Sequence, residues 1–169
     1  MAERDRQGLL AAAEEFARFK HQHQFRRDGV TPYVEHPKAV MGILRDEFEV
    51  KDVDTLAAGL LHDTIEDTAT DYDEVAERFG RRVADYVALL TKDKRLPEEK
   101  RERTYFAQLA RAPLPVRFCK IADSLHNVRD SDAAHRPKAV KKARKLLQIY
   151  GKTRGLERPI AVLRAELAK

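Results

Sequence analysis

The sequence has little that would support disulfide bonds or insertion into a membrane. Its 169 residues include one cysteine, no tryptophan and no apolar run of the length that crosses a bilayer. Cys119 alone cannot form an internal disulfide, so a reducing compartment is the simplest setting. The charged start of the chain also lacks the apolar segment of a secretory signal. We therefore expect a cytoplasmic protein without a membrane partner.

Positive charge is in modest excess. Lysine and arginine together number 33 against 28 acidic residues, which gives a net charge of +5. Such a balance suits nucleic acid, a membrane surface or a small anionic substrate. The basic residues are spread along the chain, with clusters at 26–27, 92–103 and 138–145, and no aromatic residues interleave with them as a base-stacking surface requires. Nucleic-acid binding is therefore not expected as the main function.

Apolar residues recur at helical spacing along nearly the whole chain, and no segment alternates convincingly with a period of two. This pattern predicts an all-α fold in one domain, 1–169, with a core at 9–130 and C-terminal helices at 137–167. Asp54 is expected to cap the third helix, and Asp71 with Glu74 has the spacing of a capping box for the fourth, which Gly80 ends. The predicted helices lie at 9–20, 37–48, 54–65, 71–80, 83–90, 98–111, 116–128, 137–150 and 159–167.

The segment 60–68, Leu-Leu-His-Asp-Thr-Ile-Glu-Asp-Thr, is the richest in ionisable groups. On one continuous helix, His62 and Glu66 would be neighbours four residues apart, as would Asp63 and Asp67. Adjacent carboxylates repel one another, and a bound divalent cation would turn that repulsion into attraction. Mixed nitrogen and oxygen donors favour Mn or Fe over Mg or Ca. The alternative is a polar helix face that happens to carry a histidine.

This string resembles the signature of the HD superfamily of metal phosphohydrolases. More narrowly, the chain resembles the hydrolase domain of RelA/SpoT-type alarmone enzymes, in the stand-alone form of the metazoan SpoT homologues. Three further stretches carry the resemblance: Pro-Tyr-x-x-His-Pro within 25–37, Phe-Gly followed by Leu-Thr-Lys within 79–92, and Lys-Ile-Ala-Asp-x-Leu-x-Asn-x-Arg within 120–130. The match covers 16–130, with one extra residue between Gly29 and Pro32, whereas the last quarter of the chain matches poorly.

The resemblance implies a compact HD-domain helical bundle and one divalent metal ion, with Mn²⁺ the expected ion. Asp123 also makes independent sense as a ligand, because a carboxylate in an apolar segment is costly to bury unless a metal or an arginine accompanies it. His126, one turn beyond Asp123, is expected to be a structural histidine. The metal ligands implied by the resemblance are His36, His62, Asp63 and Asp123.

The family reaction removes pyrophosphate from the ribose 3′ position of ppGpp or pppGpp and leaves GDP or GTP. Glu66 and Asp67 match the paired acids of the family: one would orient or deprotonate the water and the other protonate the leaving oxygen, with the assignment open. A highly phosphorylated nucleotide also needs cations, and a guanidinium suits this purpose. The expected substrate contacts are Arg26, Lys20 and Asn127, while Arg27 is expected to be solvated.

Two other readings stay open. One is a generic HD nucleotide phosphatase that acts on nucleoside monophosphates or on cofactors phosphorylated at the 2′ or 3′ position. The base preference also stays open, because Ser124 stands where the family usually has Arg or Lys and aromatic residues are sparse in the C-terminal helices, with Tyr150 the main candidate to contact a base. The other is a non-catalytic module that binds nucleotide or RNA, against which the intact Glu66 and Asp67 argue. The sequence leaves both a monomer and a homo-oligomer open.

Overall fold

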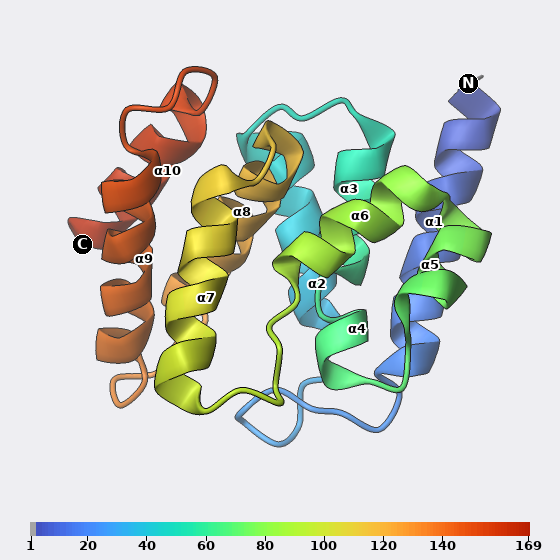
Figure 1. Cartoon of the computed structure of the whole chain (residues 1–169), viewed down its shortest axis with the longest axis horizontal. Helices are drawn as coiled ribbons and strands as arrows, with labels where there is room; N and C mark the ends of the chain where they lie inside the picture. The colour runs from blue at the N-terminus through green and yellow to red at the C-terminus, as the bar shows by residue number, and fades with distance from the viewer. Residues whose placement is uncertain (1–2) are drawn as a thin grey trace.

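The computed structural model describes the backbone of residues 3–169 and the side chains from residue 7, so Met1 and Ala2 of the charged N-terminus lie outside the described residues. Every regular element in this part is a helix, as Figure 1 shows, and the predicted all-α class is confirmed. None of the described helices is long and apolar enough to cross a membrane. In chain order the elements are α1 (Glu3–Lys20), α2 (Glu35–Gly42), the π-helical turn η1 (Ile43–Glu47), α3 (Val53–Leu61), α4 (Thr64–Asp67), α5 (Tyr72–Phe79), α6 (Arg81–Leu90), α7 (Glu98–Arg111), α8 (Leu114–Arg129), α9 (Arg136–Tyr150) and α10 (Glu157–Leu167).

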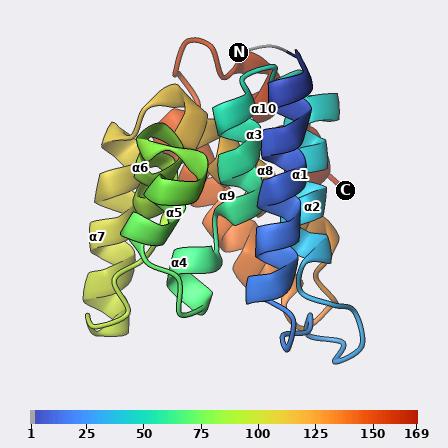
Figure 2. The ribbon, with the colours of Figure 1, turned by 90° about the vertical axis from the view of Figure 1, so that its right-hand side faces the viewer.

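Helices α3 and α8 form the centre of the bundle. Helix α3 contacts α1, α2, α6 and α8, and α8 in turn contacts α2, α9 and α10. Leu60, Leu61, Ile121 and Leu125 of these two helices are almost fully buried. Figures 1 and 2 show α9 and α10 on the far side of α8 from α1, so the C-terminal helices cover one flank of the core.

The caps of two helices differ in part from the prediction. Asp52, not Asp54, caps α3: its Oδ2 accepts a hydrogen bond from the Thr55 backbone N–H at 3.1 Å, and Asp54 instead forms an ion pair with Arg82 at 3.0 Å. The prediction failed because two aspartates lie close together, and only Asp52 has the extended backbone that an N-cap requires.

At α5 the predicted capping box is half formed. The Asp71 carboxylate accepts from the Glu74 backbone N–H at 2.8 Å, as predicted. The Glu74 carboxylate does not reach back to the cap, because it binds the Lys20 ammonium at 2.7 Å. Gly80 ends the helix as predicted, with a φ of 87° that favours glycine.

The third predicted helix is shorter than expected, and this break matters most for the site. Helix α3 ends at Leu61, and the short α4 begins at Thr64, so His62 and Asp63 lie in the turn between them. The Thr64 hydroxyl donates to the Leu61 carbonyl at 2.7 Å and so satisfies a group that the broken helix leaves unpaired. The expected continuous helix through His62 and Glu66 is therefore wrong, whereas Asp63 and Asp67 remain neighbours one helical turn apart, because the Asp67 N–H donates to the Asp63 carbonyl at 2.9 Å.

Candidate metal centre

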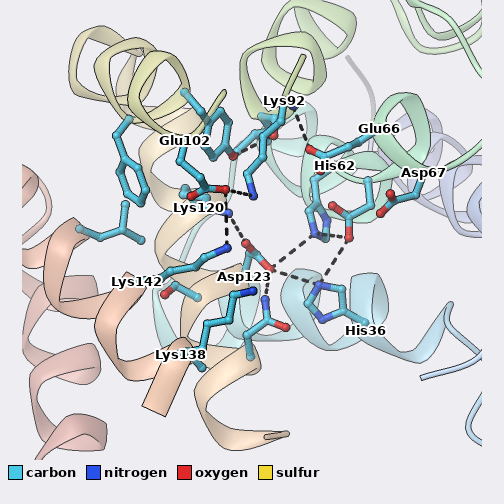
Figure 3. Close-up of a pocket in the computed structure, with 18 of the residues that line it drawn as sticks. His36, His62, Glu66, Asp67, Lys92, Glu102, Lys120, Asp123, Lys138 and Lys142 are labelled. Atoms are coloured by element: carbon cyan, nitrogen blue, oxygen red, sulfur yellow. Dashed lines mark hydrogen bonds and ion pairs between the residues drawn. The ribbon is translucent and has the colours of Figure 1, made fainter. Parts of the chain in front are cut away.

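Four side chains from three parts of the chain converge at the centre of the bundle. His36 lies in the first turn of α2, directly before Pro37, and Asp123 lies in the middle of α8. His62 and Asp63 come from the turn after α3, where the two adjacent side chains can face the same point. Figure 3 shows His36, His62 and Asp123 pointing toward one another. The structure thus brings together all four of the predicted ligands.

The donor atoms form a closed ring in which nitrogen and oxygen alternate. His36 Nε2 lies 3.2 Å from Asp123 Oδ1 and 3.7 Å from Asp63 Oδ2. His62 Nε2 lies 3.1 Å from Asp63 Oδ2 and 3.8 Å from Asp123 Oδ1. Neighbouring ligands of one cation with bonds of about 2.1 Å are about 3.0–3.5 Å apart, which is close to the observed separations. The ring therefore has the size that a divalent cation requires.

His62 is oriented as a metal ligand. Its Nδ1 lies 2.8 Å from the Gly59 carbonyl oxygen, an acceptor, so Nδ1 carries a hydrogen and Nε2 is the nitrogen left to bind a metal. Nε2 is buried and makes no hydrogen bond within the described residues. Close approach of α3 to η1 supports this arrangement, because a Cβ on Gly59 would lie only 2.5 Å from Leu44 Cδ1. A buried ring nitrogen that faces two carboxylates and lacks a partner fits a bound cation.

His36 is held by a second histidine. His36 Nδ1 lies 2.8 Å from His126 Nδ1, so one of these nitrogens must donate to the other. Burial, together with the nearby His36 ring, lowers the pKa of His126 to about 4, so His126 is neutral at pH 7 and can accept through Nδ1. Donation by His36 Nδ1 leaves His36 Nε2 free to face Asp63 and Asp123. His126 thus occupies the place of a positioning residue.

Both carboxylates of the ring are kept charged. Burial raises the pKa of Asp63, but attraction to His62 outweighs it and leaves the pKa below the usual range, while the Tyr33 hydroxyl donates to Oδ2 at 2.5 Å. Burial likewise raises the pKa of Asp123, and Lys120, whose Nζ lies 2.6 Å from Oδ2, holds it well below the usual range. Burial lowers the pKa of His62, yet Asp63 and Asp123 raise it to about 9. A metal ion would therefore compete with a proton for the His62 ring.

A pocket of about 260 Å³ opens beside the ring. Glu66 lines it, and its Oε2 accepts from the Lys92 backbone N–H at 2.9 Å, while burial raises its pKa. Asp67 also lines it, with Oδ1 2.5 Å from the Lys94 ammonium. Figure 3 shows Lys120, Lys138 and Lys142 on the opposite side of the pocket from these two acids, whereas Lys92 lies beside Glu66. The lining lysines are Lys92, Lys120, Lys138 and Lys142.

The structure places one of the three predicted substrate contacts at the pocket and two away from it. Asn127 lines the pocket and donates to Asp123 Oδ1 at 2.5 Å. Lys20 lies in another hollow, bound to Glu74, so the structure does not place it at the pocket. Arg26 does not line the pocket either, because its guanidinium is bound to Asp130 at 2.6 Å.

The neighbouring Arg27 is exposed, as expected, and it also lines the pocket, which Arg26 does not. Tyr150 is buried in the core, where its hydroxyl donates to the Leu109 carbonyl at 2.9 Å, so the expectation that it contacts a base is wrong. Sequence reasoning also missed Lys120. Its spacing of three residues from Asp123 on one helix was the available signal.

Comparisons of the sequence and of the fold with known proteins agree on the family of the chain. An HD-domain family profile matches residues 13–154 of the chain. The guanosine-3′,5′-bis(diphosphate) 3′-pyrophosphohydrolases MESH1 of Mus musculus and Homo sapiens are each 44% identical over 123 residues, which is 72% of this chain and 68% of the relative. The guanosine-3′,5′-bis(diphosphate) 3′-pyrophosphohydrolase of Aquifex aeolicus is 38% identical over 144 residues, 83% of this chain and 20% of that much longer protein. The solved structure of a metazoan SpoT orthologue, described as hydrolysing ppGpp, superposes with a TM-score of 0.85 at 29% identity and covers 95% of this chain and 94% of that one.

Proposed function

The chain belongs to the HD-domain family, among the relatives of the MESH1 pyrophosphohydrolases, and we propose that it hydrolyses ppGpp or pppGpp at the ribose 3′ position. The products would be pyrophosphate and GDP or GTP. One observation carries the proposal: the alternating ring of two histidines and two aspartates opens onto a pocket that holds the half-buried Glu66 and a wall of lysines. A phosphorylated substrate needs all three elements. We also propose the cytoplasm as its location, which the single free and buried thiol of Cys119 supports.

His36, His62, Asp63 and Asp123 would hold one divalent ion, and we propose Mn²⁺ because the donors are half nitrogen and half oxygen. Such an ion supplies a nucleophilic water at neutral pH and stabilises negative charge on phosphoryl oxygens. Lys120 and His62 keep the two aspartates charged, and the Tyr33 hydroxyl holds Asp63 in place. The protein thus presents four preorganised donors without the cost of deprotonating a carboxylic acid.

Glu66 is proposed to handle the proton. Its Oε2 is fixed by the Lys92 backbone N–H, which leaves Oε1 for the water and the leaving group. Burial raises the pKa of Glu66 toward neutrality, which is where a group that both takes and returns a proton works best. Glu66 would accept the proton of the attacking water and pass it to the ribose 3′ oxygen. Asp67, bound to Lys94, is proposed to orient groups at the rim.

The test is the identity of the products from a panel of nucleotides. The Mn²⁺-loaded protein is incubated with ppGpp, with guanosine and adenosine monophosphates and with a cofactor phosphorylated at the 2′ position, and the products are separated by ion exchange. We expect intact pyrophosphate and GDP from ppGpp, without added ATP. Orthophosphate from the monophosphates, with no pyrophosphate from ppGpp, would contradict the proposal and favour a general nucleotide phosphatase.

A further inference from the structure

Helix α9 presents two lysines to the pocket from the side opposite the catalytic acids. Lys138 and Lys142 lie four residues apart, so they share one face of the helix, and both line the pocket. Figure 3 shows both side chains directed toward the region around Asp123. No acidic residue occurs in α9, so the helix itself offers these lysines no partner. The C-terminal quarter of the chain thus contributes directly to the pocket.

The lysine wall carries more positive charge than its acidic neighbours balance. Lys120 is paired with Asp123 at 2.6 Å, and Lys92 with Glu102 at 3.0 Å. Lys142 shares the same Glu102 oxygen at a longer 3.7 Å. Lys138 forms no ion pair within the described part of the chain, so four lysines face two carboxylates. This surplus of two charges suits an anion with at least two negative charges.

The positive charges of the lysines also repel one another. Burial, followed by the like charge of Lys92, lowers the pKa of Lys142. A phosphate group bound between them would remove that repulsion and would be held by charge-assisted hydrogen bonds. Glu102 keeps Lys92 and Lys142 directed toward one point, so little reordering of long side chains would accompany binding.

The volume of the pocket is small for a nucleotide with phosphates at both ends. Its volume of about 260 Å³ lies below the roughly 300–1,000 Å³ of most small-molecule sites, so part of such a ligand must extend to the rim. With the 3′-diphosphate at the His and Asp ring, the 5′ phosphates are the part left to the rim, where Lys138 is exposed. We propose that Lys138 and Lys142 form an anion subsite for the 5′-diphosphate, which selects nucleotides phosphorylated at both ends. This inference rests on the proposed function.

The first test compares two substrates that differ only at the 5′ end: guanosine 3′,5′-bis(diphosphate) and guanosine 3′-diphosphate. In Lys138→Ala and Lys142→Ala, we expect kcat/KM for the first substrate to fall about tenfold to hundredfold, and to fall much less for the second. Lys141→Ala is the matched control, because Lys141 lies on the outward face of the same helix and should leave both values within about twofold. Equal losses on both substrates, or no loss, would overturn the subsite.

The second test measures binding without turnover. Calorimetry gives the affinity for GDP, which has only 5′ phosphates, in the wild type and the three variants. The subsite predicts that GDP binding weakens about tenfold or more in Lys138→Ala and Lys142→Ala and not in Lys141→Ala. Unaltered GDP affinity in both pocket variants would overturn it, even if ppGpp is hydrolysed. Weakened GDP binding in a protein that does not hydrolyse ppGpp would support the subsite and refute the proposed function instead.

Discussion

Replacement of His126 tests whether its contact with His36 contributes to the affinity of the site for the metal. His126 Nδ1 lies 2.8 Å from His36 Nδ1, and in His126→Ala that ring nitrogen loses its partner. Loss of an outer-shell partner of a ligating histidine costs about tenfold to hundredfold in metal affinity. At about 1.4 kcal/mol for each factor of ten, this corresponds to about 1.4–2.8 kcal/mol. The folding stability of the metal-free protein should fall less, by about 0.5–1.5 kcal/mol, the net worth of one hydrogen bond.

The assay is a competition between the protein and a chromophoric chelator for Mn²⁺, with thermal unfolding of the metal-free variants measured in parallel. His126→Asn should recover part of the affinity, because its side-chain oxygen can accept from His36 Nδ1 near the position of the lost ring nitrogen. His23→Ala is the control, since His23 is exposed and outside the pocket. Wild-type metal affinity in His126→Ala would refute the positioning role.

Three further predictions concern the ring, the acid and the loop. His62→Ala and Asp63→Ala should each lose most of the metal found in the wild type by elemental analysis, and equal metal content in all three would rule out the ring as the site. Glu66→Gln should keep the metal and lose most of kcat, whereas a near-normal kcat would mean that Glu66 does not handle the proton. Arg27→Ala should raise KM for ppGpp about tenfold or more, because Arg27 lines the pocket. Arg26→Ala should change KM less and lower the melting temperature slightly, because Arg26 is bound to Asp130 outside the pocket. A larger rise in KM for Arg26→Ala than for Arg27→Ala would restore Arg26 as the substrate contact.

The fold and the ring were predictable because they depend on local patterns. Helical periodicity places apolar residues such as Leu60 and Ile121 in the core, and the structure buries them. The four residues of the ring belong to short sequence motifs, and they come together once the helices pack.

The break after Leu61 was not predictable from periodicity, because the apolar spacing continues through Ile65 while the helix does not. His62 and Asp63 lie in this break, with His62 Nε2 3.1 Å from Asp63 Oδ2.

The cationic side of the pocket was largely hidden from sequence reasoning. Lys138 and Lys142 are separated from the ring by many residues, and only the packing of α9 against α8 brings them to the pocket. Arg26 and Arg27 are adjacent in the chain, so the sequence could not decide which one faces inward. In the structure, Asp130 at the C-terminal end of α8 binds Arg26 and holds it away from the pocket. Side-chain partners of this kind depend on tertiary contacts.

Release of pyrophosphate from guanosine 3′,5′-bis(diphosphate) shows most directly whether the proposed metal centre carries out the reaction. The Mn²⁺-loaded wild type and His62→Ala are assayed side by side, each before and after addition of EDTA. We predict one pyrophosphate for each GDP formed by the wild type, with activity abolished by EDTA and by the substitution. Pyrophosphate release that survives both the chelator and the loss of His62 would contradict a reaction carried out at this metal centre.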